Sequence, residues 1–372
     1  MTTTQGVFNE TTLLRQRHRA DELMFDDRIK QQFIPKINTY NYLRNLQTAT
    51  INQAFNARPG KDFEIELMWM NACADFSRDD NSCEYGGNEV STNTEVHELK
   101  KRIVKGFTVY DAKFRDNEFG RDEAVAKGML QIDKQIAEQF TQYLIAKLNM
   151  FAGVNQVTHG KGVINPNDNT ITDIESQDWT AEIMAYFSRV MQLNRFGNAA
   201  LINGSNLYET IYVATAKASD AVGMGDYILW NREFPIWWDL FNIDSVNADS
   251  DSEDLFSYLI NAGAIAMASK NWNPSTPTPN MTDIRWQMPS RFMPGMTYDI
   301  FYRNTCVGED DMSTLGTEYK DTLKHDYKFV LTADMFKNPY GCDAEAKDSD
   351  GNIAGENSGI LRFRNVDELP SS

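Results

Sequence analysis

The sequence predicts an α+β protein in which a long hairpin, a long helix and a mixed α/β unit follow one another along the chain. Alternating apolar and polar residues within 61–110 are typical of a half-exposed β-hairpin. Apolar residues recur every three or four positions over 121–151, which indicates a long amphipathic helix. From residue 178 onward helical and strand patterns alternate, as in α/β or α+β units.

The first thirty residues are polar, and Arg15, Arg17 and Arg19 flank His18. This pattern fits a mobile arm or a solvated helix, and the alternative is an arm that reaches a neighbouring subunit. The segment lacks the apolar core of a secretory signal, so we expect folding in a reducing cytoplasm. The longest charge-free apolar-leaning run, 255–269, has about 15 residues, short of the ~18 that a membrane helix needs.

The charge of the chain excludes several functions. The 36 Lys and Arg residues and 53 Asp and Glu residues give a net charge of −17. Nucleic-acid clamps and binders of anionic membranes need clustered basic residues, so we expect neither. Apolar residues make up 41% of the chain and aromatic residues 12%, which excludes a disordered protein.

The predicted hairpin is strongly acidic in its outer part. Its first strand carries Phe63, Ile65 and Leu67 in alternation, and its return strand is expected at about 99–110, after a polar excursion of about thirty residues. From Lys61 to Leu99 inclusive the chain has ten acidic and two basic residues, whereas Lys100, Lys101, Arg102 and Lys105 mark the base. We expect such an acidic projection to contact a basic partner surface, and the alternative is simple solvation.

These charges give the candidate interface residues between subunits. They are Arg15, Arg17, Arg19, Glu64, Glu66, Asp75, Asp79, Asp80, Glu84, Lys100, Lys101 and Arg102.

The long helix is the clearest element of the sequence. Its apolar positions are Val125, Met129, Ile132, Ile136, Phe140, Leu144, Leu148 and Phe151. Asp122 and Glu123 lie in the first turn, where the helix dipole favours acids, and Gly153 is a candidate C-cap. About thirty residues make a helix of about 45 Å, against a radius of gyration of about 21 Å for a compact chain of this length. Such a length fits a backbone strut.

The remaining chain is expected to start with a Gly-, Asn- and Pro-rich connection over 154–177. Asp178 is expected to cap a helix that ends at Gly197, a strand follows at 199–203, and Ser205 caps the next helix. Further strands are expected near residues 227–230, 236–243, 264–268, 284–288, 298–306 and 327–331. The tail from Cys342 is acidic and loop-like.

No motif for catalysis, metal binding or cofactor binding is complete, so we expect a protein that is not an enzyme and has no cofactor. Cys73, Cys83 and His97 lie close in sequence, but no CxxC spacing supports zinc. A Cys73–Cys83 disulfide would require an oxidising medium, and free thiols are the default. Trp237 and Trp238 could line a sugar site together with Trp230, Trp272 and Trp286, although aromatic residues on strands belong more often to a core or an interface.

Three segments carry a resemblance to a known family. They are KGFTVYDAKFRDNEFGRDEAVAKGMLQIDKQIAEQF (105–140), NAALINGSNLYETI (198–211) and LFSYLINAGAIAMASKNW (255–272). In the order of their predicted elements and in their local residue patterns, they resemble the major capsid proteins of tailed bacteriophages, which have the Hong Kong 97-like fold. The resemblance implies an N-terminal arm (1–55), an extended loop (56–112), a peripheral domain (113–154 and 316–372) with a spine helix (121–151), and an axial domain (155–315).

The resemblance further implies hexamers and pentamers that form an icosahedral shell around phage DNA, without sequence-specific contacts to it. A portal would be a partner, and the shell would assemble in the host cytoplasm. Capsid proteins that carry their own scaffold usually have a long helical N-terminal extension. Here only about the first thirty residues are available for one, so we expect a separate scaffolding protein. In covalently crosslinked members of this family, a lysine of the extended loop bonds to an asparagine of a neighbouring subunit. No lysine lies between Lys61 and Lys100, so we expect no such crosslink from the loop tip.

Three other functions remain open from the sequence. A carbohydrate-active or carbohydrate-binding globular protein would use the Trp and Asp residues. A different phage component, such as a portal or sheath protein, would assemble only into rings. An encapsulin-type compartment shares the capsid fold, and the sequence does not separate the two.

Overall fold

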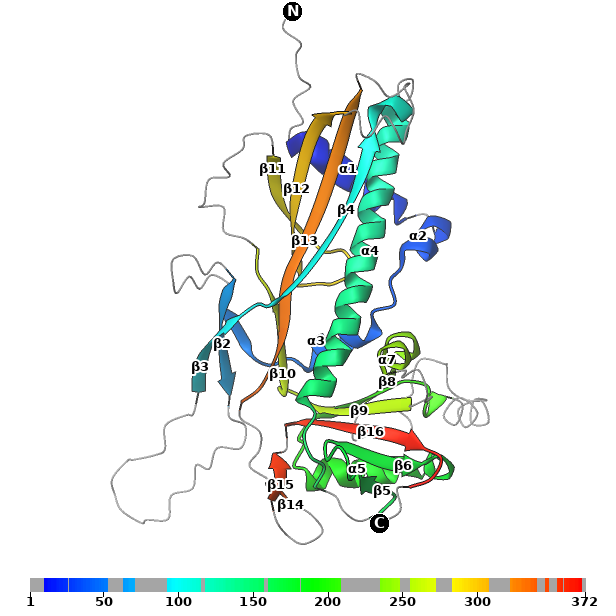
Figure 1. Cartoon of the computed structure of the whole chain (residues 1–372), viewed down its shortest axis with the longest axis vertical. Helices are drawn as coiled ribbons and strands as arrows, with labels where there is room; N and C mark the ends of the chain where they lie inside the picture. Colours follow the sequence, from blue (N-terminus) through cyan, green and yellow to red (C-terminus); the bar gives the residue numbers. More distant parts are fainter. Residues whose placement is uncertain are drawn as a thin grey trace, which may run out of the picture. The chain divides into compact units, whose positions relative to one another are not determined.

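A computed structural model describes residues 10–25, 27–52, 63–70, 92–114, 118–156, 160–180, 182–208, 235–247, 255–271, 283–307, 322–339, 345–347, 353–356 and 358–369 (Figure 1). The chain divides into two compact units. The first comprises Met1–Pro35, Leu99–Gln139 and Ser269–Ala333, and the second comprises Lys36–Glu98, Phe140–Ala268 and Asp334–Ser372. The arm, loop and domain ranges implied by the resemblance stay a prediction.

The long helix α4 (Glu118–Phe151) confirms the predicted helix and starts three residues earlier. Seven of the eight apolar positions given above are buried, from Val125 to Leu148. The helix crosses from the first unit into the second within this buried row. In the described part of the chain, no helix is both long and apolar enough to span a membrane.

The sheet of the first unit is antiparallel and packs on α4. Its strands are β4 (Lys101–Tyr110), β11 (Asp283–Pro289), β12 (Thr297–Cys306) and β13 (Leu323–Lys337), and β13 pairs with both β4 and β12. Phe107 stacks on Tyr327, with 4.7 Å between ring centroids. A Cβ atom on Gly128 of α4 would lie 2.9 Å from the Phe107 ring, so glycine permits this close approach of helix and sheet.

Short helices and turns complete the first unit. They are α1 (Glu10–Leu23), α2 (Asp27–Phe33) and the 3₁₀ turn η1 (Asp111–Phe114). Ala20 and Leu23 of α1 pack against Ala126 and Leu130 of α4. The N-terminal segment therefore contains a helix, as one reading of the sequence expected.

The second unit is built on a six-stranded mixed sheet in the order β5-β6-β16-β9-β7-β8. The strands are β5 (Gly162–Ile164), β6 (Ile171–Glu175), β7 (Ala199–Asn203), β8 (Ile236–Trp238), β9 (Leu255–Asn261) and β16 (Ile360–Val366). Helix α5 (Ile183–Leu193) packs on this sheet, where Phe187 meets Phe363 at 4.9 Å between ring centroids. Helices α3 (Asn38–Leu46) and α7 (Leu240–Asn247) also belong to this unit.

Smaller sheets complete the second unit. β1 (Thr50–Asn52), β2 (Glu64–Met70) and β3 (Thr92–Glu98) form a three-stranded antiparallel sheet, and β14 (Glu345–Lys347) pairs with β15 (Ile353–Glu356). Strand β10 (Ile265–Ser269) neighbours β13.

The predicted partner of the first hairpin strand was wrong. β2 pairs with β3, from Glu64 opposite Glu98 to Met70 opposite Thr92. Residues 101–110 form β4, which pairs instead with β13. The large apolar residues of β4, such as Phe107, belong to the core of the first unit and not to the hairpin. Residues 71–91 of the excursion, with Cys73 and Cys83, lie outside the described residues.

Four other expectations need correction. Asp178 does not cap α5: it ends the 3₁₀ turn η2 (Ser176–Asp178) and binds Lys161, with 2.9 Å between Nζ and Oδ1. The expected connection at 154–177 contains β5 and β6. The expected strand 236–243 ends after Trp238, because Asp239 accepts the main-chain N–H of Asn242 and starts α7. The expected loop-like tail contains β16, which is a central strand.

The remaining expected elements either agree with the structure apart from where they end, or lie outside the described residues. Helix α5 ends at Leu193, four residues before Gly197, and the strands expected at 199–203, 264–268, 284–288, 298–306 and 327–331 are confirmed. The strand expected at 227–230 and the body of the helix after Ser205 lie outside the described part of the chain.

Asp173 is expected to be a large contributor to the stability of the second unit. This fully buried carboxylate accepts two hydrogen bonds from Arg364, at 2.8 and 3.0 Å, and one from Asn165 at 2.7 Å. Asp173→Ala leaves these donors without their acceptor, so we expect the free energy of unfolding to fall by about 3–5 kcal/mol. Urea denaturation measures this loss. Asp178→Ala, at a half-buried carboxylate that pairs with Lys161 at the surface, is the control, with an expected loss below about 1 kcal/mol.

Candidate assembly surfaces

The sheet of the first unit has an outer face that carries positive charge. In antiparallel pairs, directly opposed residues project from the same face. Val104 lies opposite Val330, Thr108 opposite Asp326, and Lys328 lies opposite both Gly106 and Phe301. Phe107, whose ring meets α4, alternates with these positions, so this is the face away from α4.

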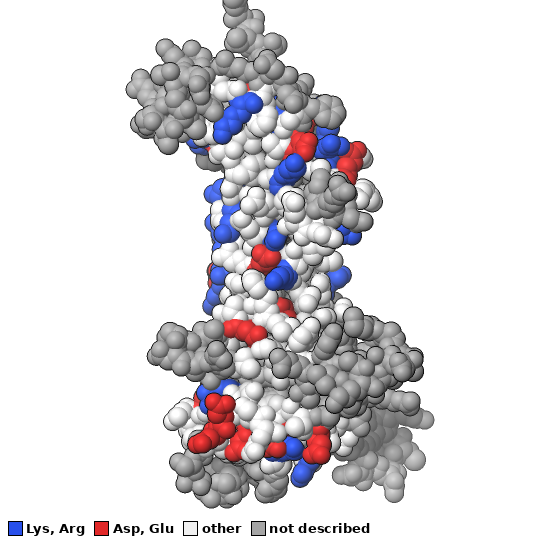
Figure 2. Space-filling view, turned by 90° about the vertical axis from the view of Figure 1, so that its right-hand side faces the viewer, with Lys and Arg blue, Asp and Glu red and all other residues white. Residues whose placement is uncertain are grey.

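We call this surface the basic face and define it by its projecting residues on the three strands. They are Arg102, Val104 and Thr108 of β4, Arg303 of β12, and Lys324 and Lys328 of β13. Arg102, Thr108, Arg303 and Lys328 are exposed, and 45% of Val104 is accessible. In Figure 2 several Lys and Arg side chains lie along the left edge of the molecule. On the basic face itself, Arg102, Arg303, Lys324 and Lys328 concentrate positive charge on an otherwise acidic chain.

Local contacts order the basic face. The Nζ atom of Lys328 lies 5.7 Å from the centroid of the Phe301 ring, a cation–π arrangement. Thr108 donates its hydroxyl to Asp326 at 2.6 Å, and Asp326 lies between Thr108 and Arg303 across the strands. An acid thus sits among the basic residues, but the sum of the charges on the face is positive.

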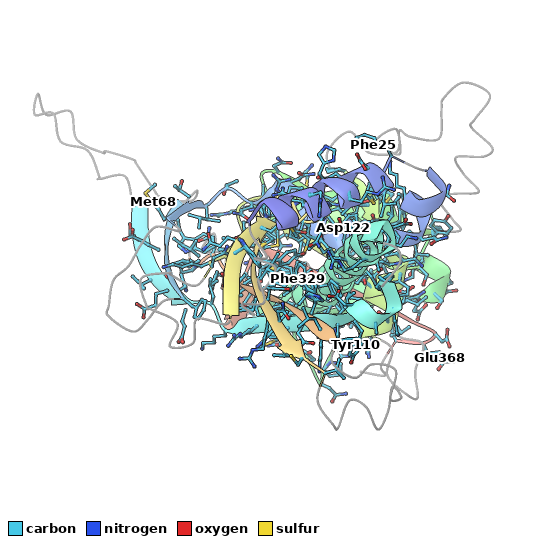
Figure 3. All side chains as sticks on the ribbon, turned by 90° about the horizontal axis from the view of Figure 1, so that it is seen from above. Phe25, Met68, Tyr110, Asp122, Phe329 and Glu368 are labelled. Carbon is cyan, nitrogen blue, oxygen red and sulfur yellow. The ribbon has the colours of Figure 1, made fainter. Side chains whose placement is uncertain are left out.

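The three-stranded sheet of the second unit has one buried and one exposed face. Ile65, Leu67 and Trp69 of β2 are at most 1% exposed. The opposite face carries Met68 and Val96, which are 40% and 47% exposed. Figure 3 shows Met68 at the surface.

We call this exposed surface the acidic face, and its residues alternate with the buried ones. They are Glu66, Met68, Thr94, Val96 and Glu98. Glu66 lies opposite Val96, and Met68 lies opposite Thr94. The face therefore has two exposed apolar side chains at its centre and carboxylates beside them. Its chemistry complements that of the basic face, which has Val104 beside Arg102 and Lys328.

The structure places the predicted interface residues unevenly. Arg102 and Lys100 are exposed, and Glu66 lies on the acidic face, but Glu64 is only 5% exposed. Asp75, Asp79, Asp80 and Glu84 lie outside the described residues.

The arginines of the arm contact their own chain. Arg15 pairs with Asp122 at 3.3 Å, and Arg19 with Glu22 at 2.7 Å. The main-chain oxygen of Arg17 accepts a hydrogen bond from Arg291. The contacts of Arg15 and of the Arg17 main chain help to hold α1 in place, whereas the Arg19–Glu22 pair lies within α1.

Sequence reasoning missed Met68, Val96, Val104 and Lys328. Charge counting does not find apolar members of a surface, and Lys328 is far from the hairpin in sequence. The alternation within each strand was visible, but the pairing of β4 with β13 was needed to place Lys328 beside Gly106.

A Tyr–His–Asp chain in the first unit holds strands to the start of α4. Tyr302 Oη lies 2.6 Å from His325 Nδ1, and His325 Nε2 lies 3.0 Å from Asp111, which also pairs with Arg121 at 3.3 Å. Burial raises the pKa of the Tyr302 phenol, and Asp111 raises it further. A phenol held in its neutral form in this way is a poor nucleophile, so the arrangement acts as a structural tie.

Two of the described side chains considered for other functions contact their own chain, whereas Cys73 and Cys83 lie outside the described residues. Trp237 stacks on Tyr42 with 4.4 Å between ring centroids, so that face of its indole ring is covered. His97 lies 3.2 Å from Glu95, and burial is the main cause that lowers the pKa of its imidazole. Within the described ranges, no group of three or more His, Cys, Asp or Glu residues is arranged to hold a metal ion.

No protein-family model and no curated protein sequence matches this chain. Solved structures do resemble it. The capsid of the cyanophage P-SCSP1u is 11% identical with a TM-score of 0.40, covering 84% of this chain and 86% of that one. A virus-like particle from Pyrococcus furiosus is 10% identical, also with a TM-score of 0.40, over 94% and 98% of the two chains.

An encapsulin provides a third structural relative. The holo-SrpI encapsulin complex from Synechococcus elongatus is 9% identical, with a TM-score of 0.40, over 88% of this chain and 87% of that one. The solved structures that resemble this chain thus include phage capsids and an encapsulin, the two classes named from the sequence.

Proposed function

We propose that the chain is a major capsid protein that assembles with copies of itself into the shell of a tailed bacteriophage. The observation that carries the proposal is the pair of strand faces described above. Each has an exposed apolar centre, and the two have opposite charge. Apolar contact favours association, and complementary charges fix register and partner choice.

The two faces belong to different surfaces of the chain, so contact between them is heterologous. Heterologous contacts form rings when the rotation between neighbours closes. Rings of six and five copies are the units from which an icosahedral shell is built. The acidic face of one copy would thus bind the basic face of the next copy around a hexamer or pentamer.

The finer assignments are part of the same proposal. The arm, extended loop, peripheral domain and axial domain take the ranges given in the sequence analysis. The twelve candidate residues given there contribute to contacts between subunits, together with Met68, Val96, Val104 and Lys328. A separate scaffolding protein directs assembly in the host cytoplasm, a portal occupies one vertex, and the mature shell encloses DNA.

Electron microscopy of the purified protein tests the proposal. Negative-stain images and light scattering should show closed shells or rings of five and six copies. Because screening weakens contacts between exposed charges, the assembled fraction should fall as NaCl rises from 0.05 to 1 M, if the two faces meet as proposed. A chain that remains a 42.4 kDa monomer at all concentrations, with or without its scaffolding protein, would contradict the proposal.

The chemistry of the loop gives a second test on intact particles. With no lysine between Lys61 and Lys100, the loop tip cannot form a lysine–asparagine crosslink. Boiled and reduced particles should therefore run as one band near 42.4 kDa in denaturing gels. A ladder of covalent oligomers would overturn this expectation and leave the shell assignment itself intact.

A further inference from the structure

Helix α5 ends in a turn that is fixed by the core of the second unit. The main-chain N–H of Phe196 donates to the oxygen of Met191 at 2.9 Å, and that of Arg195 donates to the oxygen of Gln192 at 3.1 Å. These two bonds form a Schellman motif, in which a residue in the left-handed conformation closes the helix. Both Phe196 and Met191 are buried in the hydrophobic core beside the sheet, so packing holds the turn in this form.

Asn194 holds the same turn through hydrogen bonds. It is fully buried, and its Nδ2 group donates to the main-chain oxygen of Val190 at 2.8 Å and to Asn155 Oδ1 at 3.0 Å. Its Oδ1 atom accepts the main-chain N–H of Gln156 at 3.2 Å. The backbone at the end of α5 therefore cannot relax without breaking these hydrogen bonds.

Arg195 occupies the left-handed position of this turn, with a φ angle of 57°. It is the only residue other than glycine with a positive φ in the described part of the chain. Glycine is the usual residue at such a position, because a Cβ atom is strained there. Gly197 lies two residues too late to take it. The chain thus keeps an arginine in a strained conformation, and residues held in such conformations cluster at functional sites.

The side chains at this end of the helix are open to solvent. Arg189 and Arg195 are exposed, and Leu193 is 51% exposed. Arg189 and Leu193 are four residues apart on the helix, so they lie on the same side of it. Within the described ranges, neither guanidinium group forms a hydrogen bond or an ion pair with another part of the chain. We call these three residues the α5 end.

The α5 end is positive, whereas the unit that carries it is strongly acidic. The second unit contains 15 Lys and Arg residues and 33 Asp and Glu residues, a net charge of −18, and the first unit has a net charge of +1. Arginine is enriched at protein interfaces, and an exposed leucine between two arginines adds an apolar centre. The α5 end therefore complements the acidic second unit of another copy. Two α5 ends would repel each other, because four arginines would meet.

We propose that the α5 end is a contact surface for the second unit of a neighbouring copy. This inference rests on the proposed function, and it adds a contact between second units to the contact between the acidic and basic faces. Because one α5 end does not bind another, the contact joins different surfaces of two copies, as a ring requires. The strained arginine is then explained by the ion pairs that its guanidinium group forms with carboxylates of the neighbour.

Arg195→Gly in the full-length protein separates the contact from the stability of the turn. Glycine adopts the left-handed conformation without strain, so the midpoint of urea denaturation should rise or stay unchanged. The same variant should need about ten times more protein to assemble, measured by light scattering, because each contact loses a charged partner. Arg195→Lys keeps the charge and should recover most of the assembly. Arg44→Ala removes an exposed arginine of α3 in the same unit, and as the matched control it should assemble at the wild-type concentration.

Three outcomes would overturn the proposal. If the wild type and Arg195→Gly assemble at the same concentration, the α5 end is not a contact surface, and the shell assignment stands. If Arg195→Gly loses stability and assembly together, the arginine supports the turn and not a contact with a neighbour. A wild type that never assembles, with or without its scaffolding protein, would contradict the proposed function as well.

Discussion

Reversing the acidic face with Glu66→Lys and Glu98→Lys together is expected to abolish shell assembly. The variant would place four positive side chains at the proposed contact, where the carboxylates would otherwise meet Arg102 and Lys328. Like charges opposed at an interface cost several kcal/mol, and each ring repeats the contact at every subunit. Light scattering should give the 42.4 kDa mass of the single chain under conditions in which the wild type forms rings or shells.

The compensating variant makes the experiment specific. Arg102→Glu and Lys328→Glu alone should also prevent assembly, whereas the four substitutions combined should restore it, because the signs are opposite again. Recovery requires that the two faces meet, since each surface alone remains altered. Assembly need not regain the wild-type level, because reversed pairs do not reproduce every local contact.

A matched control accounts for the change in net charge. Glu182→Lys and Glu368→Lys change the net charge by the same +4 on other exposed positions, and this variant should assemble normally. The decisive outcome combines three results: the control assembles, the acidic-face variant does not, and the combined variant does not either. That outcome would show that the two faces do not contact each other. The proposed pairing of surfaces would then be wrong even if the chain forms shells.

The sequence predicted the elements whose pattern is local. In α4 the row from Val125 to Leu148 repeats with the helical period, and every member of this row is buried. No long-range partner is needed to recognise such a row, because its geometry lies within the helix itself. The late strand around Phe329 was found for the same reason, since its alternation is strong.

Pairing between distant strands was not accessible from the same patterns. β3 has the sequence TNTEVHE, which contains one aliphatic residue. Its strand pattern is therefore weak, and the sequence did not predict it as the partner of β2. Residues 101–110 have the stronger strand pattern, but their register matches β13, more than two hundred residues away. Alternation within a strand determines which of its side chains share a face. Only the folded structure shows which other strand pairs with it.

The charged part of the candidate site was predictable, and its apolar part was predictable only in part. Counting charges identified Glu66 and Arg102, which the structure leaves at the surface or partly exposed. The alternation within 63–68 already placed Met68 on the side of Glu64 and Glu66, and the burial of Ile65 and Leu67 confirms this side. Val96 lies in a strand that the sequence did not predict, and only its pairing with Glu66 places it on the same face. Part of the predicted acidic set lies outside the described residues and stays a prediction.

Asp133→Ala is expected to be among the most destabilising single substitutions in the first unit. The carboxylate is fully buried in the middle of α4 and accepts hydrogen bonds from the Tyr298 phenol, the Ser290 hydroxyl and the Arg291 main-chain N–H. Removing it takes the shared acceptor from three donors, and the Tyr298 hydroxyl keeps only its hydrogen bond to Ser290 Oγ at 2.9 Å. Each buried donor left without its acceptor costs about 1–3 kcal/mol before relaxation. We expect a loss of about 4 kcal/mol in the free energy of unfolding, measured by urea denaturation.

Asp133→Asn separates the charge of this residue from its hydrogen bonds. Burial raises the pKa of Asp133 in the folded protein, against the lowering effect of its three hydrogen bonds and the nearby Arg291 charge. Between the unfolded and folded pKa values, the folded state therefore binds more protons than the unfolded state. It follows that the stability contributed by Asp133 is complete below the unfolded pKa, near 4, and is lost as pH rises through the folded pKa.

The difference in stability between wild type and Asp133→Asn should therefore shrink or change sign as pH rises from about 4, by at most about 1.4 kcal/mol per pH unit. It should become constant once the folded pKa has been passed. Using the difference cancels the titration of the other carboxylates, which is common to both proteins. A difference that is independent of pH, or that grows in favour of the wild type with rising pH, would show that the hydrogen bonds outweigh burial and that the pKa of Asp133 is not raised.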